Sequence, residues 1–348
     1  MTIATDPPAD GGRPWQGGAK SWLCALLGAE IRSVDIVQSL WSGYGEIARV
    51  HLDRDPADNR ASAIVKWVCP QPVHAHPRGW SGRRSHDRKL RSYEVEQNFY
   101  RREHDDAPAS ASYRTARCLA ITRRGDEFVT VLEDLDASGF GSRHAPPDVA
   151  EPEVHSCLEW LARFHAAHLG APTSNLWPTG TYWHLATRPD EFAAMKDPEL
   201  RRAAPLLDSM LHKARFRTLL HGDAKVANFC FGPSDAAASE RIAAVDFQYV
   251  GGGPGIIDVA YCLSSCLDDR ACEQRAEELL EHYFAALQNC LLAGRFAGAA
   301  AEVVAEWRAL YPAAWADFHR FLDGWAPDHW KIHRYTRAMT RRALASLS

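Results

Sequence analysis

The sequence predicts an α+β protein of two lobes, a small strand-rich N-terminal lobe followed by a larger, mainly helical C-terminal lobe. Short runs rich in Val and Ile, bounded by turn residues, predict strands at 33–40, 46–52, 62–68 and 127–133. After residue 135 the apolar residues recur at helical spacing over longer stretches. The length of 348 residues is enough for two domains.

Each lobe has a predicted order of elements. A helix is expected at 93–102, between the third and fourth strands of the N-terminal lobe. The C-terminal lobe is predicted to contain helices at 153–168, 190–195, 270–292, 299–310, 315–322 and 330–347, with strand-like runs at 219–231 and 242–250. Residues 1–18, rich in Pro, Gly and Asp, predict a flexible leader, with order beginning at 22–27. The N-terminal lobe is then 19–134 and the C-terminal lobe 135–348.

Composition excludes several classes of protein. The 40 Lys and Arg against 44 Asp and Glu give a net charge of −4, without the strong basic excess typical of a nucleic-acid binder. Nine Cys without a C-x-x-C pair predict a reduced, cytoplasmic chain. No signal peptide and no apolar run long enough to predict a membrane span is visible. The sequence gives no indication of the oligomeric state.

The most informative segment is HGDAKVANF at 221–229, followed by VDFQ at 245–248. Asp223, Asn228 and Asp246 are polar residues among apolar ones. Phosphoryl transfer needs such a set: an acid that orients the acceptor hydroxyl, and an amide and a carboxylate that hold magnesium on the phosphates. Lys225 adds a positive charge suited to the transferring phosphate. The alternative is that these polar residues merely cap a turn.

The spacing agrees with the protein-kinase pattern H-R-D-x-x-x-x-N followed by D-F-G, with Gly222 in place of Arg and Gln248 in place of Gly. Together with VDFQYVGGGPGIIDVAY at 245–261, the segment resembles the CHK-type kinases, which include choline-kinase-like and ecdysteroid-kinase-like phosphotransferases and are relatives of the aminoglycoside phosphotransferases. The resemblance covers most of residues 35–345 and implies a bilobal protein-kinase-like fold.

The fold implied by this resemblance requires three features upstream, and each is present in order. WSGYGE at 41–46 places Gly43 and Gly45 between two strands, where backbone amides can approach phosphate. Lys66 is a charge within an apolar strand, so it calls for an anion nearby, such as ATP phosphates and a helix carboxylate. By family pattern that carboxylate is Glu96, and Glu94 is the competitor, because the two face opposite sides of a helix.

The resemblance also implies roles for three residues outside these motifs. Glu133 and Leu135, in VLEDL at 131–135, are expected to contact adenine through their main chain. Asp258 is expected to fix the catalytic loop structurally. The alternative for the two main-chain contacts is an ordinary strand end with solvated carboxylates.

Other signals are weaker. Gly43 and Gly45 also fit a loose dinucleotide fingerprint, but a strand follows where that motif needs a helix. His165 lacks a metal-binding motif and is predicted to be a packed helix histidine. The basic run at 83–91 is interpreted as a solvated connection before the Glu96 helix, with attraction of an anionic substrate as the alternative.

The acceptor is expected to bind the C-terminal lobe. Two aromatic-rich segments, 175–184 and 323–331, provide the candidate contacts Trp177, Tyr182, Trp183, Trp325 and Trp330. Aromatic faces can hold a flat apolar ligand or a quaternary ammonium, although helix packing is the alternative for each. Nothing in the sequence selects among a choline-, steroid-, sugar- or aminoglycoside-like alcohol.

The sequence therefore predicts an ATP- and magnesium-dependent kinase of a small-molecule alcohol. Asp223 and Lys225 are its catalytic residues and Asn228 and Asp246 its metal ligands, while Lys66 and Glu96 serve phosphate binding. One alternative is a kinase-fold binding module without catalysis. The other is a protein kinase, which the changes at Gly222 and Gln248 and the lack of an A-P-E motif disfavour.

Overall fold

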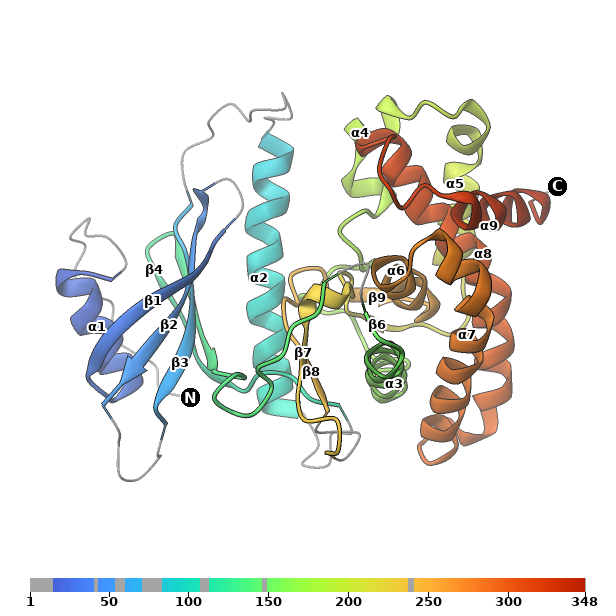
Figure 1. The fold of residues 1–348 in the computed structure, drawn as a ribbon. Coiled ribbons are helices and arrows are strands. Elements are labelled where there is room, and N and C mark those ends of the chain that lie inside the picture. Colours follow the sequence, from blue (N-terminus) through green and yellow to red (C-terminus); the bar gives the residue numbers. More distant parts are fainter. Residues whose placement is uncertain are drawn as a thin grey trace. The chain divides into compact units, whose positions relative to one another are not determined.

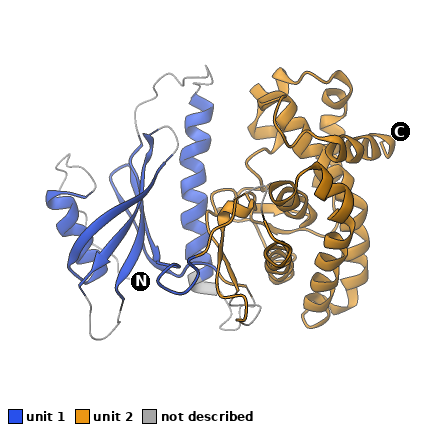
Figure 2. Cartoon of the chain, in the orientation of Figure 1, with its two compact units in different colours: residues 1–109, 115–141 blue, residues 110–114, 142–348 orange. Residues whose placement is uncertain are grey.

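The structure is a computed structural model that describes residues 15–40, 43–53, 60–70, 83–106, 113–145, 149–236 and 241–347. The chain divides into two compact units, unit 1 with residues 1–109 and 115–141 and unit 2 with residues 110–114 and 142–348 (Figure 2). Unit 1 thus extends to Gly141, past the boundary expected at 134, and the short segment 110–114 belongs to unit 2.

Unit 1 is a five-stranded antiparallel sheet with helices (Figure 1). Along the chain its elements are α1 (Gly17–Leu27), β1 (Ile31–Ser39), β2 (Gly45–Leu52), β3 (Ser62–Val68), α2 (Arg83–Asp106), β4 (Cys118–Arg124) and β5 (Glu127–Glu133), with strand order β1-β2-β3-β5-β4. Val65 and Trp67 pack with α1 on one face, whereas Val68 packs with Tyr93 of α2. Because side chains alternate along a strand, Lys66 lies on the α2 face.

Several helices and strands of unit 1 have other bounds in the structure than the sequence predicts. α2 begins at Arg83, so the basic run at 83–91 forms its first turns and is not a connection, which corrects the prediction. Leu90 packs against the Tyr93 cluster, and the surrounding charges hid this apolar position in the sequence. The structure adds β4, which ends in two arginines at the edge of the sheet. α1 starts at Gly17, and residues 1–14 of the expected leader lie outside the described residues.

Unit 2 is mainly helical. Its helices are α3 (Glu151–Ala167), α4 (Pro189–Ala194), α5 (Pro198–His212), α6 (Ile256–Cys266), α7 (Asp269–Leu292), α8 (Ala300–Trp325) and α9 (Arg334–Ala345), with short 3-10 turns at Leu185–Thr187, Val226–Asn228 and Ala297–Ala299. Two short antiparallel pairs complete it, β6 (Thr218–Leu220) with β9 (Gly251–Gly253) and β7 (Phe229–Phe231) with β8 (Ile242–Ala244). Every residue of α6 is buried, so this helix forms the centre of the unit.

In unit 2 the observed elements differ from the predicted ones where helices contain proline and where the strands are short. The helices expected at 299–310 and 315–322 are one helix, α8, which continues through Pro312 because its flanks Tyr311 and Trp315 are buried and held by packing. α5 contains Pro205 and was not predicted, although the Asp197 carboxylate caps it by accepting the Glu199 and Leu200 amides. The long strand-like runs shorten to three-residue strands, and the last helix begins at Arg334.

Two general predictions concern thiols and membranes. All nine cysteines are free thiols, and five of them are buried. None of the helices within the described ranges has both the length and the apolar character needed to cross a bilayer.

Candidate functional site

The polar loop at 221–228 in unit 2 is held between the two short strand pairs. β6 leads into it from Leu220, and β7 leaves it at Phe229. The Val245 amide, just after β8, donates to the Asn228 carbonyl at 3.0 Å, so the β7–β8 pair brings the loop close to Asp246. A Cβ on Gly222, whose φ is +80°, would lie 2.0 Å from the Tyr249 carbonyl oxygen. Only glycine therefore fits at the position where the kinase pattern has Arg.

Asp223 is the centre of the hydrogen-bond network in this loop. Its Oδ2 accepts from Lys225 Nζ at 2.9 Å and from Asn228 Nδ2 at 3.1 Å. Its Oδ1 accepts from the Tyr261 hydroxyl at 3.1 Å. Asn228 Nδ2 also donates to the Asp223 carbonyl at 2.8 Å. The carboxylate is thereby fixed in one orientation by three side chains.

Asn228 and Asp246 present the oxygen atoms suited to a hard cation. Because the amide nitrogen of Asn228 donates to Asp223, its oxygen is the atom that could meet a cation. Asp246 adopts a left-handed conformation with φ of 69°, and Gln248 Nε2 donates to its Oδ1 at 2.6 Å. Non-glycine residues rarely take this conformation, and those that do cluster at functional sites.

The electrostatics of the loop favour Asp223 as a proton acceptor. Burial, together with the charge of Asp246, raises the pKa of Asp223 above its ordinary value in spite of the Lys225 ammonium. Burial alone would lower the pKa of Lys225, yet the Asp223 carboxylate outweighs this and raises it. Burial outweighs the opposite charge at Asp223 but not at Lys225, because the Asp223 side chain is 9% exposed and that of Lys225 is 38% exposed. A raised carboxyl pKa makes Asp223 a stronger base than an ordinary aspartate.

One face of α6 supports the loop. Asp258 accepts from the backbone amides of His221 at 2.6 Å and Gly222 at 3.1 Å, so it holds the loop as expected. Tyr261, three residues on, donates to Asp223, and Ser265 Oγ accepts from the Val226 amide at 2.9 Å. Positions three, four and seven residues apart share one side of a helix, so a single helix positions the whole loop.

His165 is a packed helix histidine, as predicted. It is fully buried, its Nε2 is 3.2 Å from Asp258 Oδ2, and its Nδ1 is 2.9 Å from the Tyr283 hydroxyl. Its contacts orient Asp258, which in turn holds the loop.

In unit 1 the structure pairs Lys66 with Glu96. Lys66 Nζ lies 2.7 Å from Glu96 Oε2, and the two residues are 5% and 3% exposed. Glu94 instead forms ion pairs with Arg91 and Arg123 at the surface. The pairing of Lys66 with Glu96 agrees with the sequence prediction and removes Glu94 as the competitor.

The glycine-rich turn connects β1 and β2. Gly43 has φ of +73°, and its amide donates to the Leu40 carbonyl at 3.1 Å. Gly45 has φ of +130°, and a Cβ there would lie 2.1 Å from the Trp67 carbonyl oxygen on β3. Both positions therefore need glycine, while Trp41 and Ser42 of the motif lie outside the described residues.

The segment expected to contact adenine is closely bonded within unit 1. The Glu133 amide donates to the Arg117 carbonyl at 2.9 Å, and the Leu135 carbonyl accepts from Phe140 at 2.8 Å and from Ser138 at 3.1 Å. The Glu133 carboxylate accepts from Ser138 Oγ and from the Arg117 amide. Adenine contacts at Glu133 and Leu135 stay a prediction.

The five candidate aromatic contacts fall into three groups. Trp183 is fully buried and donates to Asp317, and Trp177 donates to the Gln248 carbonyl, so both brace the fold. The Tyr182 hydroxyl is 3.3 Å from that of Tyr261, which brings it next to the Asp223 loop. Trp325 and Trp330 are 37% and 48% exposed, large values for tryptophan.

Two residues near Asp223 were not assigned from the sequence. Tyr261 is the last residue of the motif at 245–261, and its spacing of three from Asp258 on a helix is the signal that places it at the loop. Lys331 ended an aromatic-rich segment, and no local pattern reveals its burial, because the residues around it come from α6 and α8.

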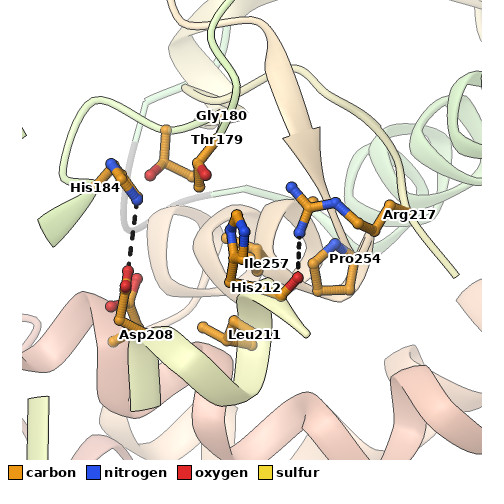
Figure 3. A pocket seen from close by; sticks show the side chains of 12 residues that line it. Thr179, Gly180, His184, Asp208, Leu211, His212, Arg217, Pro254 and Ile257 are labelled. Atoms are coloured by element: carbon orange, nitrogen blue, oxygen red, sulfur yellow. Dashed lines mark hydrogen bonds and ion pairs between the residues drawn. The ribbon is translucent and has the colours of Figure 1, made fainter. Parts of the chain in front are cut away.

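Figure 3 shows a pocket in unit 2 lined by residues on several elements. His184 Nε2 is 3.5 Å from Asp208 Oδ1, and Arg217 donates to the His212 carbonyl at 2.8 Å. Asp223, Asn228 and Asp246 do not line it. The pocket therefore lies apart from the residues predicted to be catalytic or metal-binding.

The residues present fit a magnesium ion shared with phosphates. Within the described ranges no group of three or more His, Cys, Asp or Glu side chains could hold a metal by itself. Magnesium in phosphoryl-transfer sites uses one or two protein ligands and takes the others from phosphate and water. Asn228 and Asp246 can supply such oxygen ligands.

Solved structures similar to this chain share a protein-kinase-like fold. A microcompartment-associated aminopropanol kinase matches with a TM-score of 0.50 and 14% identity, covering 90% of this chain and 93% of that one. The amicoumacin kinase hAmiN has a TM-score of 0.47 and 14% identity, covering 90% and 87%. Aminoglycoside 2'-phosphotransferase-IIIa has 0.46 and 11%, covering 92% and 94%. The predicted protein-kinase-like α+β fold is confirmed.

The sequence profile of the ecdysteroid kinase-like family matches residues 182–295. This segment contains the Asp223 loop, Asp246 and α6, and it confirms the resemblance that these motifs predicted. The match covers about a third of the chain. No curated protein sequence matches the chain significantly.

Proposed function

We propose that the protein transfers the γ-phosphoryl group of ATP to a hydroxyl group of a small molecule. The observation that carries the proposal is the fixed Asp223 carboxylate, which accepts hydrogen bonds from Lys225, Asn228 and Tyr261 and has a raised pKa. This arrangement orients an alcohol and accepts its proton. The kinase-like fold and the family match support it.

In the proposed reaction the acceptor oxygen attacks the γ-phosphorus. A new O–P bond forms while the bond between the β,γ-bridging oxygen and the γ-phosphorus breaks, ADP leaves, and the hydroxyl proton passes to Asp223. Lys225 stabilises the charge on the transferring group, and Asn228 and Asp246 would hold magnesium. Magnesium, when bound, would neutralise phosphate charge. Lys66, oriented by Glu96, would bind ATP phosphates, with Gly43 and Gly45 allowing a close backbone approach.

A screen of hydroxyl-containing metabolites and antibiotics for ATP consumption tests this function. The purified full chain should consume ATP with at least one alcohol and form its phosphate ester. Asp223→Ala should lower turnover at least about a hundredfold, as expected for loss of a preorganised charged group. Asp235→Ala, at an exposed turn position, is the matched control and should keep full turnover.

Two results would oppose the proposal. Full transfer activity of a folded Asp223→Ala variant would remove Asp223 from the reaction. ATP binding without transfer to any alcohol would favour a kinase-fold binding module. Circular dichroism of each variant shows whether the fold is retained.

A further inference from the structure

Lys331 carries a buried positive charge surrounded by aromatic rings. The residue is 8% exposed, and its Nζ lies 4.8 Å from the centre of the Tyr261 ring, 5.4 Å from that of Phe318 and 5.6 Å from that of Trp330. Its hydrogen bond to Ser264 Oγ is long, at 3.4 Å. Among the described residues no carboxylate lies within 4.0 Å of this ammonium.

A buried ammonium without a counter-ion is costly. Aromatic faces offset part of this cost, because the ring quadrupole attracts a cation. A long hydrogen bond to one hydroxyl leaves most of the donor capacity of the ammonium unused. An anion that binds beside Lys331 would gain a charge-assisted hydrogen bond in a weakly solvated place.

Tyr261 connects Lys331 to the reacting centre. Its hydroxyl donates to Asp223 at 3.1 Å, while its ring faces the Lys331 ammonium. Burial lowers the pKa of Lys331, and Asp223 is the neighbouring charge that raises it most. A molecule whose hydroxyl meets Asp223 can therefore reach Lys331 along one tyrosine ring.

The same geometry disfavours cationic acceptors. Aromatic faces beside a catalytic aspartate could have held a quaternary ammonium, but here the cation over these faces belongs to the protein. A second positive charge would be repelled by Lys331 in a region that screens charge poorly. Beyond it, Trp325 and Trp330 expose apolar surface for the rest of an acceptor.

We propose that Lys331 recognises the acceptor, and that this acceptor is an alcohol carrying an anionic group, a carboxylate or a phosphate monoester. The proposal rests on the proposed phosphotransferase function. It assigns Lys331 as the specificity-determining residue, with the hydroxyl at Asp223 and the anionic group at Lys331.

The test compares acceptors that differ only in charge. The probes are ω-hydroxy carboxylates of increasing chain length, their primary amides, the corresponding alcohol phosphate monoesters, and trimethylammonium alcohols of equal length. Transfer from ATP gives kcat/KM for each probe, and calorimetric titration gives its binding without any reaction. The carboxylate and phosphate probes distinguish the two sources of negative charge.

Wild type should prefer an anionic probe over its neutral counterpart by about tenfold to a hundredfold, the usual effect of a hydrogen bond to a charged group. Lys331→Met should abolish most of this preference, and Lys331→Arg should keep part of it. Lys213→Met, at an exposed lysine after α5, is the matched control and should retain the wild-type preference.

The outcomes separate this proposal from the proposed function. Anion binding that depends on Lys331, with no transfer to these probes or to any alcohol of the screen, would refute the phosphotransferase function and still support anion recognition. Transfer with the same charge preference in wild type and Lys331→Met would overturn the role of Lys331. A wild-type preference for trimethylammonium alcohols, or no binding of any anionic probe, would overturn it as well.

Discussion

Each unit buries a lysine, and the two lysines differ in the groups that surround the ammonium. Lys66 in unit 1 is 5% exposed and has Glu96 at 2.7 Å, whereas Lys331 in unit 2 is 8% exposed and has aromatic rings but no carboxylate within 4.0 Å among the described residues. A paired buried charge is balanced within the fold. A buried charge without a carboxylate partner in the fold can be balanced by an anion that binds beside it. Lys66 therefore has a counter-ion within the fold, whereas we propose that the acceptor supplies the counter-ion of Lys331.

The largest expected effect is on the stability of unit 1. Lys66→Met should lower the free energy of unfolding by about 3 kcal/mol or more, because it leaves the Glu96 carboxylate buried without its ammonium. Chemical denaturation followed by circular dichroism measures this loss. The double variant with Glu96→Leu should recover most of it, since no charge then remains buried.

The corresponding variant in unit 2 is Lys331→Met, for which we expect a different effect on the free energy of unfolding. It should leave the free energy of unfolding within about 1 kcal/mol of wild type or raise it, because an apolar side chain replaces a buried ammonium without a carboxylate partner. A loss as large as that of Lys66→Met would mean that Lys331 has a structural counter-ion after all.

The next effect is on the pH profile. Burial lowers the pKa of Lys331 to about 8, with Asp223 opposing the shift. The ammonium is charged below this pH and neutral above it, so kcat/KM for an anionic acceptor should fall as pH rises through about 8, by up to about tenfold per pH unit. A neutral acceptor should show no such fall.

The fall in kcat/KM near pH 8 forms the basic limb of the pH profile. Its assignment to Lys331 needs a control, because other titratable groups lie near the Lys331 ammonium. These are Asp223, Lys225, Tyr261, Cys262, Cys266, His329 and His333. The pKa of Lys225 is raised and that of Tyr261 is raised well above its ordinary value, so neither should titrate near pH 8. Lys331→Met should lack the limb, and its persistence there would assign it to another group.

The smallest effect concerns the link between Lys331 and Asp223. Tyr261→Phe keeps the ring and removes the hydrogen bond to Asp223, so turnover should fall about fivefold to tenfold. The acidic limb of the pH profile should move to higher pH, because a carboxylate that loses a donor has a higher pKa. An unchanged acidic limb would show that this hydrogen bond does not tune Asp223.

Local patterns in the sequence predicted most of the polar loop. The spacing of Asp223, Asn228 and Asp246 along the chain was informative because one strand pair joins them. Lys66 and Glu96 were predictable because a strand and a helix each have a fixed side-chain period. Their roles in nucleotide binding stay predictions.

Features that depend on distant packing were not predictable from local patterns. Lys331 lies in a turn, and its burial comes from Tyr261 of α6 and Phe318 of α8. α8 continues through Pro312 only because its flanks are packed, which propensity alone does not reveal. The basic start of α2 has few apolar positions, so its helical period was hidden by charge.

The most direct test of the account is phosphorus NMR of wild type with ATP, magnesium and an ω-hydroxy carboxylate. We expect a new phosphate monoester formed in equal amount with ADP, strongly reduced with Asp223→Ala and weaker with the matching amide. Inorganic phosphate as the sole product, or the same ester formed equally well by Asp223→Ala, would contradict it.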